Sequence, residues 1–249
     1  MQKQFTAPTH YFLQEGRANL RECLNIAFKS ATQQNVAKLI IFTAKGEGVR
    51  LALDSFLSLE EYRHIQLVAV TFPAGQSFTD QQGTNFTVQI PETELAFFRE
   101  KGVPLVRAHL PFDQVAPFYR HHGELGQGLA AIGQALNMFC GSMSLCVQAI
   151  TLACDAGFVA LGEHVISLTS DTAILAQATS THRMIGELVI REILCKPVVM
   201  SIVRREVAEK LPRQLSIPLE NPGPIIIVNA EHKDSASSGS KSPEPHTKD

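Results

Sequence analysis

The stretch KLIIFTAKGEGVRLA, residues 38–52, decides the fold. Its apolar first half is typical of a buried strand, the glycines at 46 and 48 mark a tight turn, and the remainder starts a helix. A strand that runs into a helix N-terminus directs backbone N–H groups and the positive end of the helix dipole at one point. The stretch therefore predicts a βα unit with a candidate anion site, but it identifies no chemistry.

Similar patterns recur along the chain. A helix is expected from about Asn19, where Asn19 and Glu22 have the spacing of a capping box. Apolar runs predict strands at 65–72, 103–109, 164–169 and 197–203. Helical patterns occupy 48–58, 92–101, 125–139, 145–156 and about 187–194, and residues 75–91 form a long polar loop. Strands that alternate with helices predict an α/β fold: a mostly parallel sheet with helices on both faces.

The spacing between the third and fourth predicted strands indicates the strand order. About fifty residues of helix separate these two strands, far more than neighbouring strands require. Such an excursion suits a crossover back past the strand at 38–43, which gives the order 3-2-1-4-5. The sheet then reverses direction between strands one and four, and ligands of open α/β sheets bind at the carboxyl ends of the strands at such a point. Two loops meet there, at 43–48 and 169–172.

These two loops supply the candidate ligand-binding residues: Thr43, Lys45, Gly46, Gly48, Thr169, Ser170, Asp171 and Thr172. In the first loop, the alternative is a tight βα connection whose glycines serve backbone geometry alone. This loop lacks the spacing of a P-loop, and Glu47 would repel an anion. In the second loop, the same residue types also cap helices well, so the two interpretations are about equally balanced.

No catalytic signature occurs in the chain. The acid–base candidates for an enzyme are His109, at the end of the third predicted strand, and Asp171. Such an enzyme would act on a small phosphorylated or carboxylated substrate, and it is the alternative to a binding function. Cys146 would lie in the first turn of a helix capped by Ser144, where the dipole lowers a thiol pKa, but no partner base is evident.

Composition excludes several classes of function. The chain of 249 residues is 45% hydrophobic and carries a formal net charge of -2 with dispersed basic residues, which argues against nucleic-acid binding. The first residues lack the apolar run of a signal peptide, and no segment has the uninterrupted apolar length of a membrane span. Five scattered cysteines indicate buried thiols in the cytoplasm, and no residue spacing suggests a metal or a cofactor.

Several segments together resemble a known family. They are the stretch at 38–43, KGVPLVRAH at 101–109, NMF at 137–139, CVQAITLACDAG at 146–157, EHVISL at 163–168, DTA at 171–173 and REILCKP at 191–197. Over residues 12–199, the chain resembles stand-alone archaeal and bacterial proteins related to the C-terminal domain of pyruvate kinase.

The resemblance implies a three-layer α/β/α sandwich of this strand order with an antiparallel last strand. In pyruvate kinases, the equivalent domain carries no chemistry and can bind a phosphorylated regulator. The relatives have a Thr-Gly-Arg-Gly turn after the fourth strand, which is reduced here to Thr169-Ser170. If that turn binds phosphate in the relatives, the site is weakened or lost here.

The sequence thus predicts one α/β domain over 1–228, with a C-terminal extension from about 202 and a disordered tail at 229–249. The short apolar strand at 225–228 would cover the domain's own sheet edge or pair in a homodimer. The expected function is that of a cytoplasmic binding or regulatory protein for a small anionic metabolite, without kinase chemistry of its own.

Overall fold

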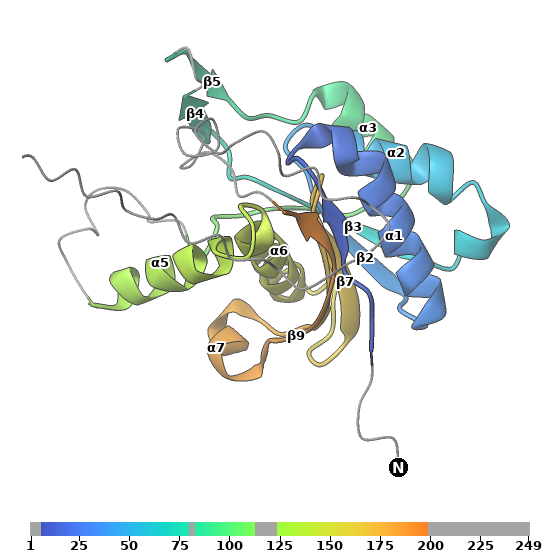
Figure 1. Ribbon diagram of the computed structural model, residues 1–249. Helices are drawn as coiled ribbons and strands as arrows, with labels where there is room; N and C mark the ends of the chain where they lie inside the picture. Colours follow the sequence, from blue (N-terminus) through green and yellow to red (C-terminus); the bar gives the residue numbers. More distant parts are fainter. Residues whose placement is uncertain (1–5, 80–82, 113–123, 199–249) are drawn as a thin grey trace, which may run out of the picture. The chain divides into compact units, whose positions relative to one another are not determined.

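The computed structural model describes residues 6–79, 83–112 and 124–198, all of which lie within one compact unit, Met1–Ala208 (Figure 1). The central sheet contains β1 (His10–Phe12), β2 (Lys38–Phe42), β3 (Gln66–Thr71), β6 (Leu105–Arg107), β7 (His164–Leu168), β8 (Ala173–Gln177) and β9 (Val189–Pro197). A separate hairpin is formed by β4 (Ser77–Thr79) and β5 (Asn85–Thr87). The helices are α1 (Leu20–Gln33), α2 (Glu47–Leu51), α3 (Glu92–Glu100), α5 (Glu124–Asn137), α6 (Met143–Asp155) and α7 (Met184–Glu187).

The sheet has the order β1-β9-β8-β7-β2-β3-β6. Strands β6, β3, β2 and β7 are parallel, so the predicted order 3-2-1-4 is confirmed. Strand β8 pairs antiparallel with both β7 and β9, and β9 pairs parallel with β1. The fifth predicted strand, at 197–203, was expected next to the fourth and antiparallel to it, and this is wrong. Strand β8, which was not predicted, occupies that place and is the antiparallel strand, whereas β9 runs in the direction of β7, and β9 and β1 extend the sheet beyond β8.

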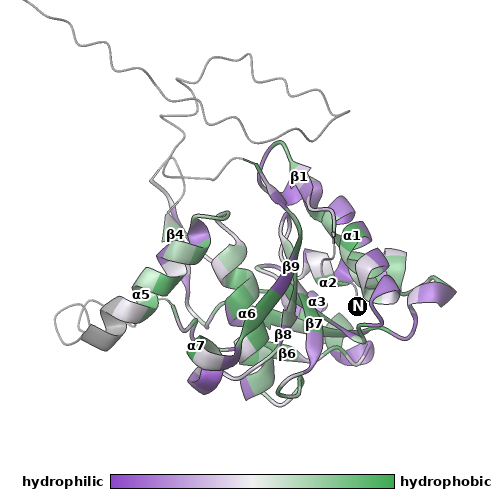
Figure 2. Ribbon diagram, turned by 60° about the horizontal axis from the view of Figure 1, so that its bottom comes forward, coloured by the Kyte–Doolittle hydropathy of each residue, from purple (hydrophilic) through white to green (hydrophobic). Residues whose placement is uncertain are grey.

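Helices cover both faces of this sheet (Figure 1). In β2, Leu39 and Ile41 point into a core with α1, α2 and α3, whereas Ile40 and Phe42 point into a second core with α5 and α6. Because successive side chains of a strand alternate between faces, a strand buried on both faces is apolar throughout. This explains the continuous apolar run at 39–42, and Figure 2 shows the hydrophobic colouring concentrated between the layers.

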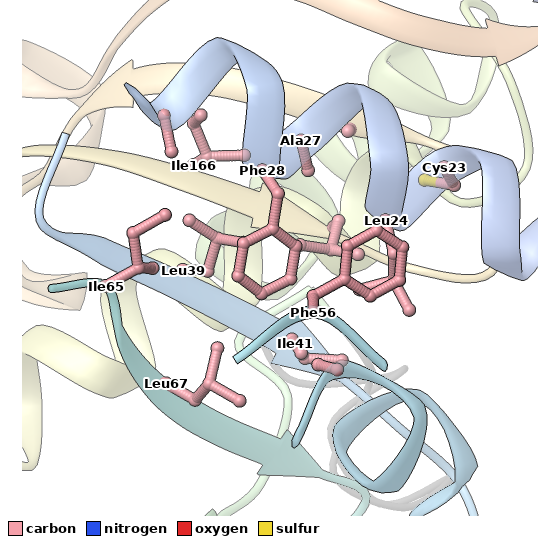
Figure 3. Packing of buried hydrophobic residues seen from close by; sticks show 14 of the residues in the cluster. Cys23, Leu24, Ala27, Phe28, Leu39, Ile41, Phe56, Ile65, Leu67 and Ile166 are labelled. Atoms are coloured by element: carbon pink, nitrogen blue, oxygen red, sulfur yellow. The ribbon is translucent and has the colours of Figure 1, made fainter. Parts of the chain in front are cut away.

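Aromatic stacking anchors the first core. The rings of Phe28 from α1 and Phe56 lie parallel with centroids 4.9 Å apart, and Tyr62 packs against Phe28 at 5.2 Å. Figure 3 shows these phenyl rings beside Leu39 and Ile41 of β2. Phe56 ends a π-helical segment, η2 (Ala52–Phe56), which continues α2, so the helix expected at 48–58 is present but changes its winding.

The helix expected at about 187–194 is wrong. Only α7 is helical there, and residues 189–197 form β9. Two irregularities in the pairing of β8 with β9 shift the register between Ala173 and Ile174 and between Leu175 and Ala176. Such bulges disturb the strict alternation by which a strand is recognised in sequence. The strand expected at 197–203 overlaps β9 only at Pro197, and from residue 199 it lies outside the described residues.

Two smaller expectations also need correction. Asn19 precedes α1 but does not cap it, because its own backbone is helical at the end of a 3-10 turn, η1 (Arg17–Asn19). Its side-chain amide donates instead to the carbonyl of Gln14 at 2.7 Å, and Glu22 accepts from the amide of Asn25. The long loop expected at 75–91 contains the β4–β5 hairpin.

Three of the sequence predictions concern residues outside the described ranges: the C-terminal extension from about 202, the strand at 225–228 and the tail at 229–249. Among the described helices, none combines the length and the apolar character needed to cross a bilayer.

Candidate functional site

The two predicted loops follow neighbouring strands. In the parallel pair β2–β7, Ile41 lies opposite Leu168. Thr43 comes two residues after Ile41 and Thr169 comes directly after Leu168, so both lie at the same edge of the sheet. This edge is the carboxyl end of both strands, where the strand order reverses. We refer to residues 43–48 together with residues 169–172 as the switch-point loops.

In the first switch-point loop, several candidate residues serve the fold. The hydroxyl of Thr43 accepts the backbone N–H of Gly46 at 2.9 Å and closes the turn. Gly46 has a φ of 97°, and a Cβ there would lie 3.1 Å from Cζ of Phe98 in α3. A Cβ on Gly48 would lie 3.1 Å from Cγ2 of Ile41. Both glycines are therefore required for close packing. This agrees with the alternative interpretation of this loop, in which the glycines serve backbone geometry.

The charges at this loop differ from the sequence expectation. Glu47 forms an ion pair with Arg17 of η1 at 2.9 Å, so the carboxylate that would repel an anion is neutralised. Lys45 is exposed and makes no ion pair with any described residue. The first backbone hydrogen bond of α2 runs from the N–H of Arg50 to the carbonyl of Gly46. The N–H groups of residues 47–49 therefore have no acceptor within the helix. The local excess of charge at this loop is positive.

The second switch-point loop is a two-residue turn between antiparallel strands rather than the start of a helix. The N–H of Thr169 donates to the carbonyl of Thr172 at 2.8 Å, which closes the turn over Ser170 and Asp171. Neither residue caps a helix, so that alternative is wrong. The shortened loop that the resemblance pointed out is thus a hairpin turn, with Ser170 half-buried at its corner.

Asp171 is 3% exposed and holds this region together. Its carboxylate accepts from the backbone N–H of Gly16 at 2.7 Å, the hydroxyl of Thr172 at 3.0 Å and the hydroxyl of Thr169 at 3.4 Å. A buried carboxylate needs such donors, since an unpaired charge away from water is costly. With these donors in place, Asp171 acts as a structural anchor, and its oxygens are directed inward.

Sequence reasoning missed the segment that crosses the switch-point loops. Gly16 binds the second loop through Asp171, and Arg17 binds the first loop through Glu47. We call residues 14–19 the strap. No local pattern marks it, because Gly16 and Asp171 are separated by 155 positions in the sequence. Its one visible signal is Gly16 itself, whose φ of 107° disfavours any other residue.

Buried thiols surround the second loop. Cys23 donates to the carbonyl of Thr169 at 3.5 Å, Cys146 donates to the carbonyl of Thr172 at 3.6 Å, and Cys140 lies 3.2 Å from the hydroxyl of Thr172. Burial raises the pKa of Cys23 and of Cys146 well above its ordinary value. The expected lowering of the Cys146 pKa is therefore wrong, because desolvation exceeds any effect of the helix dipole, and Ser144 lies inside α6.

The structure does not bring His109 and Asp171 together. His109 is exposed and follows β6, whereas Asp171 is buried after β7. Strands β3 and β2 lie between β6 and β7, so their positions in the sheet are about 14 Å apart. Within the described parts of the chain, no three His, Cys, Asp or Glu side chains cluster in a way that would hold a metal ion.

Two shallow cavities lie away from the switch-point loops. One, of about 330 Å³, lies between the α5–α6 junction and β9 and is lined by Phe139, Met143 and residues 190–193. The other, of about 350 Å³, lies at the amino ends of β3 and β6 and includes Leu53, Phe158 and Pro104. Neither contains a residue of the switch-point loops.

Known proteins resemble this chain only weakly. No protein-family model matches this chain. Solved structures similar to it include the pyruvate kinase of Cryptosporidium parvum, with 14% identity and a TM-score of 0.30 over 67% of this chain. The same enzyme in complex with ADP gives equal values, and a third structure of a pyruvate kinase from this organism matches 73% of the chain at 15% identity and a TM-score of 0.28. The chain spans about a quarter of the length of these enzymes.

Proposed function

We propose that this protein binds a small anionic metabolite, such as a phosphorylated or carboxylated compound, at the switch-point loops. The observation that carries the proposal is the cationic side chain of Lys45 beside the start of α2, which has no ion-pair partner among the described residues. The nearby carboxylates already have partners: Glu47 pairs with Arg17, Glu94 with Arg50, and Asp171 accepts from three donors. An anion at this position would meet Lys45, the N–H groups of residues 47–49 and, from the second loop, Ser170.

The proposal divides the candidate residues by role. Lys45 and Ser170 would contact the ligand, because their side chains reach the surface. Thr169, Thr172 and Asp171 are buried and bind one another or the strap, and the buried Thr43 hydroxyl accepts from Gly46, so these four residues would position the loops. Gly46 would allow α3 to approach the first switch-point loop, and Gly48 would allow α2 to approach β2.

A binding or regulatory role fits this site better than catalysis. The thiols around the second loop are buried with raised pKa values, the Asp171 oxygens are occupied by donors, and His109 lies three strands away. No described arrangement supports the enzyme alternative. The resemblance to stand-alone relatives of the pyruvate kinase C-terminal domain agrees with a domain that binds a regulator without chemistry of its own. A cytoplasmic location and a homodimer remain predictions from the sequence.

A thermal-shift panel of sugar phosphates, nucleotides and carboxylates tests the proposal. A ligand present at 100 times its dissociation constant should add about 2.7 kcal/mol to the free energy of unfolding. Lys45→Ala should abolish most of this shift. Lys29→Ala is the matched control, since Lys29 is an exposed lysine on α1 that forms no ion pair with a described residue. If no anion shifts Tm, or if both variants respond alike, the proposal is wrong.

A further inference from the structure

Two of the buried thiols lie in contact with each other. Sγ of Cys195 on β9 is 3.5 Å from Sγ of Cys23 in α1, and both residues are 0% exposed. A disulfide has an S–S length of about 2.05 Å, so the two sulfurs need to approach by about 1.5 Å to bond. A shift of this size is within reach of side-chain rotation combined with a small movement of one helix.

We propose that Cys23 and Cys195 form a peroxide-sensitive dithiol that closes to an intrachain disulfide. One thiol, as its thiolate, attacks a peroxide oxygen to give a sulfenic acid and releases the other oxygen as water. The second thiol then attacks the sulfenic sulfur, forming the S–S bond and releasing a second water. The two thiols lose two electrons and the peroxide gains them, so each disulfide consumes one peroxide.

The reaction requires the N-terminal segment to open. Cys195 has His10 of β1 as its backbone partner on one side and Ala173 of β8 on the other. Strand β1 has only three residues and lies at the sheet edge, so it is the neighbour that separates at least cost. Burial raises the Cys23 pKa, which keeps this thiol protonated and unreactive while the segment is closed. The rate of oxidation should therefore follow the opening of β1 and the strap.

Disulfide formation would also alter the second switch-point loop. In the reduced protein, the Cys23 thiol donates to the carbonyl of Thr169 at 3.5 Å. A disulfide sulfur has no proton to donate, so oxidation removes this hydrogen bond at the end of β7. The bond would tie α1 to β9 and change the contacts of Thr169 at the same time. The proposal does not depend on whether an anion binds at these loops.

The test uses the full-length protein with Cys154→Ser, because Cys154 is the one cysteine that is not fully buried and would be oxidised by itself. Hydrogen peroxide treatment, followed by alkylation in denaturant and peptide mapping, should give a cross-link between the peptides that contain Cys23 and Cys195. Free thiols should fall from four to two, since this variant retains four of the five cysteines. Dithiothreitol should restore all four.

Two further variants identify the pair. Cys23→Ser should abolish the cross-link, whereas Cys146→Ser, at an equally buried position, should retain it. Gly16→Ala should increase the rate of cross-linking several-fold, because it weakens the strap that must open. The proposal is overturned if peroxide leaves all four thiols free or links a different pair. Peptide mapping of the Cys154→Ser protein alone decides this, so the outcome does not depend on whether the other variants fold.

Discussion

The backbone N–H of Gly16 donates a 2.7 Å hydrogen bond to the carboxylate of Asp171, and this bond joins the N-terminal strap to the turn after β7. This hydrogen bond explains why an aspartate and a glycine are found at these two positions. Asp171 needs donors because it is buried, and Gly16 supplies one from a backbone conformation with a φ of 107°. The turn at which the sheet reverses direction is thus held in place from a distant part of the chain.

Asp171→Ala should lower the free energy of unfolding by about 2–4 kcal/mol, because three donors lose their acceptor in a buried position. Urea unfolding followed by circular dichroism measures this loss. The matched control is Asp155→Ala, since Asp155 accepts one backbone N–H, from Thr181, in an exposed position. The control should cost less than about 1 kcal/mol. Equal losses in the two variants would show that Asp171 does not anchor the strap.

Gly46→Ala should be more destabilising than Gly102→Ala. Both glycines have a positive φ, so an alanine strains the backbone at either position by about 1 kcal/mol. At Gly46 the added Cβ would also lie 3.1 Å from Phe98 and 3.2 Å from Glu94, whereas at Gly102 nothing lies within 4 Å. We expect an extra loss of about 1–2 kcal/mol for Gly46→Ala in chemical denaturation. A larger loss at Gly102 would contradict this account of the first switch-point loop.

Phe28→Ala should cost about 3–5 kcal/mol, because it removes a fully buried ring from the stack with Phe56 and Tyr62. Phe28→Leu retains much of the apolar volume and should cost clearly less. Phe139→Ala is the control at a half-exposed phenylalanine, and we expect a loss below about 1 kcal/mol there. Differential scanning calorimetry orders the three variants. A Phe139 effect as large as the Phe28→Ala effect would mean that the first core does not depend on this stack.

Stability should decrease as pH rises above 9. Burial raises the pKa of Cys154 from 9.0 to about 11 and also raises the pKa values of Cys23 and Cys146 well above 9.0. A thiol whose pKa is higher in the folded state stays protonated there while the unfolded chain ionises, so each such group favours unfolding as pH increases past the unfolded value. The contribution is fully present below the unfolded pKa and is lost through the folded pKa.

Urea midpoints at pH 7 and pH 10 measure this decrease. Cys154→Ser should reduce the difference between the two midpoints, since it removes one titrating thiol without emptying the core. An unchanged midpoint at pH 10 would contradict the raised pKa values.

The sequence predicted the elements whose pattern is local. Strand β2 and helix α6 are apolar on nearly all sides because other elements of the fold pack around each of them. Each therefore appears in the sequence as a nearly continuous apolar run. The adjacency of β2 and β7 followed from one long crossover. Strand β8 was not predicted, because its five residues follow almost directly after the turn at Ser170 and Asp171. Bulges also interrupt the register in which it pairs with β9.

The sequence predicted where the two switch-point loops lie in the sheet but not their contacts. Thr43 and Asp171 follow strands, as predicted. Their side chains, however, accept hydrogen bonds from the backbone of Gly46 and Gly16 and do not point toward an open binding site. Hydroxyl and carboxylate groups have the same sequence signal whether they bind a ligand or the backbone. The Arg17–Glu47 pair was missed for the same reason as the strap, since no local periodicity connects residues from η1 and α2.

The pairing of β1 with β9 has a consequence for the order of events during synthesis. The first strand leaves the ribosome long before its partner exists, whereas β2, β3 and β6 are made close together and can pair early. The sheet is therefore expected to grow from its middle and to be completed at the β1 edge last. A nascent chain that is halted before β9 should be cut by protease within β1, and the completed chain should resist. If the halted chain and the completed chain resist the protease equally, β1 must be protected by another part of the chain before β9 is made.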